Sequence, residues 1–530
     1  MKSLFLLLVI GLYGCFAAEP QSATSIPSPV RDPKGKVSNG ASQSPAARPS
    51  SPKAADANQP QAKASADRQK PKEQPVVQPP VVPPIIVAKI GDYVVTRQEL
   101  EHKLMMELRP YEYEQYNIIA ALPDAKTVLV KIIAEKAMVM EGRRQNFLED
   151  PEIRGVVRQF KDRNLANLLL QKHLQSKLII TESEVEEKMK ADPKLDHAQA
   201  KAMLERVKAN KLLDQYYSDI YAKFHVKKLS DNFDKAAKIH ERLLHYPKTP
   251  HDVGFIRNKQ IDTDLTPEEK DMVLATYDGG KLILKDWFSA LCEMAPPRRP
   301  TNLNTPAGVE QLLDVALRIP LFVSEAELLG LDKDENFLKQ VKEWEDLHLL
   351  NKVRTEKVKN INEPTPEQII DYFNKNKEVF ITDRTLKIDQ IWCQDLKTTH
   401  KAKAELDGGK DFESVRGLYS LEKKGAPLNT YPATEGIFFN DLWKGEPNQL
   451  IAPVKGFYGE IVKWRIVKIL EKNPGKAAEY SDDMRDRIKR KMVSERGNAL
   501  LENYGKELLE KYKYEIYADR ISDIDPLNIP

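Results

Sequence analysis

The chain has 530 residues and a mass of 60.4 kDa, which at roughly 150 residues per domain predicts several domains and excludes a single small module. Its 82 lysines and arginines against 79 aspartates and glutamates give a net charge of +3, a balance that argues against a nucleic-acid partner. Three cysteines, Cys15, Cys292 and Cys393, are too few for a disulfide framework or a four-thiolate zinc site. We therefore expect apolar cores, no metal and no cofactor.

Residues 1–18 are typical of a secretory signal, because Lys2 precedes an apolar run from Leu4 to Ile10 that is too short to span a bilayer. Two outcomes of cleavage stay open. The segment ending in Gly14-Cys15 resembles a bacterial lipobox, in which Cys15 would be acylated; cleavage after Ala17 or Ala18 would instead leave a soluble protein. We expect export to the periplasm or cell envelope, with membrane contact only through such a lipid anchor.

Residues 19–84 are rich in Pro, Ala, Ser, Gln and Lys and carry almost no aromatic or large aliphatic residues before Val76. Such a composition cannot bury a core, so we expect a disordered spacer. It either lifts the folded part away from a membrane or is filler without a specific role.

The folded part begins with two short strands around the turn at Gly91, and Thr96 with Glu99 then forms a capping box that predicts a helix from Leu100 to about Leu108. Apolar periodicity predicts further helices near residues 128–144 and 152–176, and a second capping box opens another at Thr181.

The chain repeats itself. Glu141–Asp150 aligns with Glu325–Asp334 at an offset of 184 residues, and at the same offset the capping box at Thr181 meets another at Thr365. Further along, Leu212–Tyr216 aligns with Leu500–Tyr504 at an offset of 288. The second copy therefore carries 288 − 184 = 104 additional residues, the size of one small domain. We expect each copy to be a strand pair with three or four helices, closed by its own long returning helix.

The predicted fold class is α+β and mostly α-helical, with two related helical units, the second interrupted by a β-α-β-β domain. The domains that we expect are a signal, a spacer, a first helical unit, a connector, a second helical unit in two pieces, an inserted domain and a tail, at residues 1–18, 19–84, 85–229, 230–270, 271–380 with 481–516, 381–475, and 517–530, respectively.

The inserted domain contains Gly409-Lys410-Asp411-Phe412 and a later Leu442-Trp443-Lys444-Gly445-Glu446 segment, and the first unit opens with the phrase from Val87 to Leu100. These motifs resemble parvulin-type peptidyl-prolyl isomerases and, for the whole chain, SurA/PrsA/PpiD-like exported foldases. The resemblance covers most of residues 85–516. It implies a chaperone that binds unfolded or nascent exported polypeptides.

Two positions depart from the family. Its first strand usually carries a histidine where this chain has Gln390, and its last strand carries a second where this chain has Arg465. The paired histidines help to order a pocket that favours the twisted X-Pro amide, so their replacement predicts a weak or inactive isomerase. Arg465 would place a permanent charge where a neutral ring belongs.

An apolar peptide-binding groove is predicted from four side chains, for which ordinary core packing is the alternative: Phe438, Phe439, Leu442 and Trp443. For the whole chain the favoured function is a folding factor that holds non-native polypeptide. Two alternatives stay open, an active peptidyl-prolyl isomerase and a non-enzymatic envelope scaffold lipoprotein.

Overall fold

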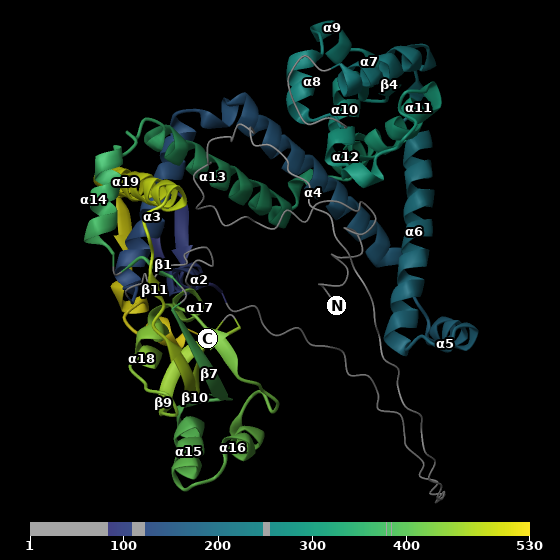
Figure 1. Ribbon diagram of the computed structural model, residues 1–530. Coiled ribbons are helices and arrows are strands. Elements are labelled where there is room, and N and C mark those ends of the chain that lie inside the picture. Colours follow the sequence, from purple (N-terminus) through teal and green to yellow (C-terminus); the bar gives the residue numbers. More distant parts are fainter. Residues whose placement is uncertain are drawn as a thin grey trace, which may run out of the picture.

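The computed structural model describes residues 83–108, 122–246, 255–377, 379–382, 384–459 and 461–529. The predicted signal, nearly all of the spacer and Cys15 lie outside these residues. The first copy contains β1 (Ile86–Ile90), β2 (Tyr93–Thr96), α2 (Arg97–Leu108), α3 (Ala125–Arg144), α4 (Pro151–Lys177), α5 (Glu182–Ala191), α6 (His197–Lys223) and β3 (Lys227–Lys228). The α+β, mainly helical class expected from the sequence is confirmed (Figure 1).

The second copy repeats this order after a short connector. The connector consists of α7 (Phe233–His245), α8 (Asn258–Asp264) and α9 (Pro267–Lys270). The second copy contains β4 (Val273–Tyr277), β5 (Gly280–Ile283), α10 (Leu284–Glu293), α11 (Pro306–Ala316), α12 (Arg318–Leu328), α13 (Glu335–Val358), α14 (Pro366–Lys375), α19 (Asp482–Lys511) and β12 (Tyr514–Ile516). Among the described helices, none combines the length and the apolar character needed to cross a bilayer.

The two copies exchange their closing helices, which corrects the expectation that each copy is closed by its own. Strand β12 of the second copy pairs with β1, and β3 of the first copy pairs with β4. The amino-terminal core, built on β12-β1-β2 with α2 and α3, accordingly includes Val353 of α13 and Leu508 of α19. The central core, built on β3-β4-β5 with α7 to α12, includes Leu169 of α4 and Leu213 of α6.

A pair of equivalent ionic contacts fixes the exchange. Glu141 at the end of α3 is 4% exposed and accepts hydrogen bonds from Lys511 Nζ at 2.7 Å and Tyr512 Oη at 2.8 Å. Its equivalent at the 184-residue offset, Glu325, is 7% exposed and accepts from Lys223 Nζ at 2.6 Å. Lys223 and Lys511 are themselves equivalent at the 288-residue offset. Each buried carboxylate thus holds the closing helix of the other copy.

Helices α4 and α13 form the bridge between the two cores. Phe160 and Trp344 are equivalent residues at the 184-residue offset, and their rings stack with centroids 4.4 Å apart. Asp150 caps α4 and pairs with Lys352 of α13. In return Asp334 caps α13 and pairs with Lys172 of α4.

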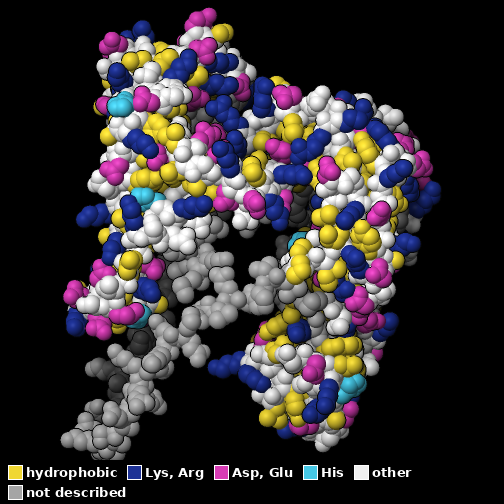
Figure 2. Space-filling model, turned by 180° about the vertical axis from the view of Figure 1, so that it is seen from behind, with side chains coloured by type: hydrophobic (Ala, Val, Ile, Leu, Met, Phe, Trp, Pro, Cys, Tyr) yellow, Lys and Arg dark blue, Asp and Glu magenta, His cyan; other side chains and the backbone are white. Residues whose placement is uncertain are grey.

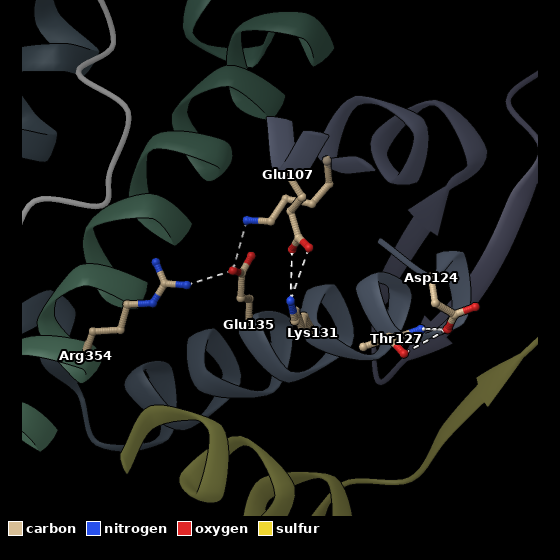
Figure 3. Close-up of polar contacts among 7 residues, drawn as sticks. Glu107, Asp124, Thr127, Lys131, Glu135 and Arg354 are labelled. Carbon is tan, nitrogen blue, oxygen red and sulfur yellow. Dashed lines mark hydrogen bonds and ion pairs between the residues drawn. The ribbon is translucent and has the colours of Figure 1, made fainter. Parts of the chain in front are cut away.

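The bridge is also tied to the amino-terminal core through a group of charged residues on α2, α3 and α13. Figure 3 shows Glu135 of α3 between two cations, with Arg354 of α13 at 2.7 Å and Lys103 of α2 at 3.3 Å. Glu107 of α2 pairs with Lys131 of α3, and Asp124 caps α3 through Thr127. Through Glu135, these contacts hold the carboxyl-terminal part of α13 against α3 and α2.

The inserted domain, residues 384–473, is a four-stranded antiparallel sheet in the order β8-β7-β10-β9. It contains β7 (Thr385–Cys393), α15 (Leu396–Asp407), α16 (Phe412–Tyr419), β8 (Leu428–Thr430), α17 (Pro432–Glu435), α18 (Phe439–Trp443), β9 (Leu450–Tyr458) and β10 (Ile461–Asn473). Helices α15 and α16 pack on one face of the sheet and α18 on the other. The edge strand β8 was not part of the predicted β-α-β-β order.

The two ends of the molecule carry different attachments. The small β6 (Ile381–Thr382) and β11 (Lys476–Ala477) pair joins the inserted domain to α14 and α19 beside the amino-terminal core. At the other end, α5 and the outer part of α6 form a hairpin that projects from the central core (Figure 1). In Figure 2 an opening beneath the bridge separates the described residues of the two ends.

We predict that Glu141→Gln lowers the free energy of unfolding by about 1–3 kcal/mol, because it removes the buried charge that pairs with Lys511 and Arg144 and weakens the hydrogen bonds that these residues donate. Chemical denaturation at neutral pH measures the effect. The control Glu149→Gln alters an exposed ion pair with Arg154 and should change stability by less than about 0.5 kcal/mol. Equal effects of the two substitutions would contradict this account of the exchange.

A second prediction concerns His240, which is 8% exposed and lies beside Trp287 and Phe288 in the central core. Burial lowers its pKa to about 4, with smaller contributions from His245 and Arg299. The neutral ring is therefore favoured in the folded state.

The stability that His240 contributes is present above its unfolded pKa of 6.5 and is lost as the pH falls from 6.5 towards 4. The shift corresponds to about 3 kcal/mol between these limits. His240→Leu should flatten the dependence of unfolding free energy on pH across this interval, whereas the exposed control His400→Leu should leave it unchanged. An unaltered slope in His240→Leu would refute the prediction.

Candidate functional site

The two positions at which the sequence resemblance leads us to expect histidines lie side by side. Gln390 is on β7 and Arg465 on β10, and the register pairs Arg465 with Trp392 and Val467 with Gln390. Arg465 Nη1 donates a hydrogen bond to Gln390 Oε1 at 2.9 Å. The sheet thus brings the two departures predicted from the sequence into direct contact.

Arg465 is compensated by a carboxylate that the sequence analysis did not identify. Its side chain is 2% exposed and forms an ion pair with Glu435, at the end of α17, which is 4% exposed. Glu435 Oε1 also accepts from Thr430 Oγ1 at 2.7 Å, and the guanidinium lies over the Trp392 ring at 4.8 Å. A permanent positive charge does occupy the site, as expected, but it is neutralised within the domain.

The backbone makes room for this arginine. Gly456 on β9 lies against it, and a Cβ at this position would stand 2.4 Å from the guanidinium carbon, Cζ. No other residue type fits there without moving the arginine. Gly456, Arg465 and Glu435 therefore depend on one another, which makes the arrangement a built structural feature and not a chance substitution.

A second buried arginine lies on the opposite face of the sheet. Arg416 of α16 is 2% exposed and pairs with Asp389, the residue next to Gln390 on β7, and with Glu413. Its Nη1 also donates to the carbonyl oxygen of Gly425 at 3.2 Å. This pair holds the loop after α16 against the sheet, so its role is structural.

The four residues predicted to line a peptide groove are not arranged as one. Phe439 and Leu442 are 1% and 0% exposed and belong to the domain core, and Phe438 is 4% exposed and packs against Phe457. Trp443 is half-buried and stacks on Phe439 with centroids 5.5 Å apart. Core packing, the alternative stated above, describes these side chains, because α18 turns its apolar face onto the sheet.

Four accessible apolar residues lie instead between the end of α16 and the start of α17, one of them at the end of α16 and one on β8. We call them the site rim, and they are Leu418, Leu421, Leu428 and Tyr431, exposed by 56%, 37%, 38% and 45%. Leu421 N donates to the carbonyl oxygen of Trp392 at 2.8 Å, which places the rim beside the Arg465 network. The apolar residues of this segment do not follow a helical or strand spacing. In the sequence they stand out only as apolar residues among turn-forming ones.

The site holds no reactive nucleophile. Cys393 ends β7 with an exposure of 0%, and burial raises the pKa of its thiol, so the thiolate is disfavoured. Within the described residues, no three His, Cys, Asp or Glu side chains are grouped so that they could hold a metal ion. The arrangement is suited to binding a polypeptide through apolar contacts beside a neutralised, hydrogen-bonded centre.

Comparison with known proteins shows that the chain is similar to two parvulin-like proteins. It is 25% identical over 222 residues to a protein described as a parvulin-like PPIase from Rickettsia bellii, covering 39% of this chain and 76% of that protein. It is 21% identical over 247 residues to the putative peptidyl-prolyl cis-trans isomerase YacD from Bacillus subtilis, covering 42% and 77%. No family model matches the chain.

Solved structures with local similarity include a SurA-like chaperone from Campylobacter jejuni at 15% identity and a TM-score of 0.24, covering 46% of this chain and 99% of that one. PrsA from Bacillus subtilis is similar at 18% identity and a TM-score of 0.17, covering 48% and 98%. The resemblance to parvulin-type peptidyl-prolyl isomerases, expected from the sequence motifs, is confirmed by the two sequence relatives.

The buried ion pair leads to a prediction. Glu435→Gln leaves the Arg465 charge buried without a counter-charge, and the free energy of unfolding of the inserted domain should fall by about 3–5 kcal/mol. The fluorescence of Trp392, which lies against the guanidinium, contributes to the signal that follows unfolding in denaturant.

The matched control is Glu413→Gln, which removes a 66% exposed partner of Arg416 and should cost less than about 1 kcal/mol. The double variant Glu435→Gln/Arg465→Met removes both charges and should recover most of the lost stability. If Glu435→Gln unfolds at the wild-type denaturant concentration, Glu435 does not neutralise Arg465.

Proposed function

We propose that the chain is an exported folding factor that holds non-native polypeptides, and that its parvulin-like domain contributes binding with weak or no isomerase activity. The observation that carries the proposal is the buried Arg465–Glu435 pair with Gln390. Lowering the barrier of about 18–20 kcal/mol to rotation of an X-Pro bond requires a pocket matched to the twisted amide. In this chain Gln390 and Arg465, which stand where the resemblance leads us to expect histidines, are hydrogen-bonded to each other.

The accessible surface of the domain supports a binding role. The site rim exposes apolar side chains beside the network, and such surfaces are typical of sites that bind other proteins. The partners that we propose are unfolded or nascent exported polypeptides. The names of related proteins, which describe isomerases and chaperones, are consistent with this class.

Export is proposed from residues 1–18, and the spacer of residues 19–84 would then separate the folded part from the point of attachment or release. Acylation of Cys15 would make the protein a membrane-anchored lipoprotein, and cleavage after Ala17 or Ala18 would make it soluble in the same compartment. Mass measurement of the mature amino terminus distinguishes the two forms.

The test combines two assays on one preparation of the chain that lacks residues 1–18. We expect no acceleration of X-Pro isomerisation in a reporter peptide, together with suppressed aggregation of a thermally unfolded client protein. Acceleration that is lost in Gln390→Ala would instead establish an active isomerase.

The same assay tests the site rim. Leu421→Ser/Tyr431→Ser should weaken aggregation suppression severalfold, because it removes two exposed apolar contacts. Leu500→Ser, which alters a 47% exposed residue on α19, is the control and should act as wild type. Suppression unaffected by the rim variant would exclude this rim as a client-binding surface.

A further inference from the structure

The duplication supplies the same helical hairpin twice, as α5–α6 and as α14–α19. Both begin with a capping box, at Thr181 and Thr365. Lys208 of the first hairpin donates to the carbonyl oxygen of Ile179 at 2.6 Å and pairs with Glu184 at 3.0 Å.

The second hairpin reproduces these contacts. Arg496, equivalent to Lys208, donates to the carbonyl oxygen of Asn362 at 2.7 Å and to Gln368 Oε1 at 3.0 Å. Gln368 is the equivalent of Glu184. A basic residue of the long helix thus contacts the start of the short helix in both hairpins. Comparing the two hairpins therefore shows which surface residues the hairpin fold does not require.

The outer surfaces of the two hairpins differ in kind. In the first, Ile179, Met203 and Val207 are 65%, 46% and 62% exposed, and Met203 and Val207 lie one turn apart on a single face of α6. The equivalents in the second are charged: Glu363 pairs with Lys489 at 2.6 Å, and Lys491 pairs with Glu495 at 3.7 Å. The apolar residues are therefore not needed to form the hairpin.

Basic residues border this apolar face. Arg206 and Lys211 are exposed on α6 and lie on either side of the line through Met203 and Val207. Lys188 of α5 is equivalent to Tyr372, whose hydroxyl group donates a hydrogen bond to Glu495 in the second hairpin. The equivalents of these three cations are uncharged: Tyr372, Ser494 and Ala499. Asp214 continues the line towards the central core, and Glu184, one turn from Lys188 on α5, is paired with Lys208.

We propose that this arm surface, made of Met203 and Val207 with Lys188, Arg206 and Lys211, binds an extended apolar polypeptide segment that carries acidic side chains. The apolar centre supplies burial, and the flexible Met203 accommodates varied side chains. The basic border selects acidic flanks by charge complementarity. The inference rests on the proposed holding function and adds to it a location and a client chemistry.

The test uses substitutions that the second hairpin already contains. Met203→Lys/Val207→Glu converts the apolar face into its charged equivalent, so the fold should be retained, as circular dichroism and thermal unfolding would verify. The probes are two fluorescently labelled synthetic peptides, both with a leucine-rich centre, one flanked by glutamates and the other by lysines. Binding is followed by fluorescence anisotropy with the chain lacking residues 1–18.

We expect wild type to prefer the glutamate-flanked peptide and Met203→Lys/Val207→Glu to bind it about tenfold more weakly, a loss of about 1.4 kcal/mol. Arg206→Ser/Lys211→Ala should reduce the preference for the glutamate-flanked peptide and leave binding of the lysine-flanked peptide unchanged or stronger. Added salt should reduce the same preference in wild type.

Two results would overturn the inference, and only the second of them would also overturn the proposed function. If Met203→Lys/Val207→Glu binds the glutamate-flanked peptide as wild type does, while wild type suppresses aggregation, the arm surface is not the site and the holding function stands. If wild type binds neither peptide and does not suppress aggregation, the proposed function fails together with the inference.

Discussion

The reciprocal exchange of closing helices is the constraint on which the rest of the structure depends. Each core leaves a buried carboxylate, Glu141 or Glu325, at the end of its last helix, and the lysine that reaches it belongs to the long helix of the other copy. Because both contacts must form together, neither core is complete without the whole chain. The exchange produces the bridge, in which α4 packs against α13 and Phe160 stacks on Trp344.

The exchange also determines where the functional surfaces lie. The insertion between α14 and α19 places the parvulin-like domain beside the amino-terminal core, while the matching α5–α6 hairpin extends from the central core (Figure 1). A duplicated scaffold thus carries two different attachments, one at each end of the bridge. The domain contains a buried arginine that is neutralised by Glu435, and the α5–α6 hairpin has exposed apolar residues where the α14–α19 hairpin has surface ion pairs.

Sequence similarity identified equivalent residues but not which copy a helix packs against. The offset of 184 correctly paired the capping boxes and also Asn146 with Gly330, both of which have a positive φ. Exchanged and unexchanged arrangements bury the same apolar faces, so periodicity cannot distinguish them. Glu435 was missed for a related reason: it lies 30 residues before Arg465 in the chain, and only the folded sheet brings the two together.

The most direct test of the exchange is to cut the chain once. A protease site inserted between residues 246 and 255 divides it into a part containing β1 to α7 and a part containing α8 to β12. After cleavage without denaturant, the account predicts that the two parts co-elute as one complex in gel filtration, because each supplies helices and a strand to the other's core. Elution as two separate folded proteins would contradict the exchange.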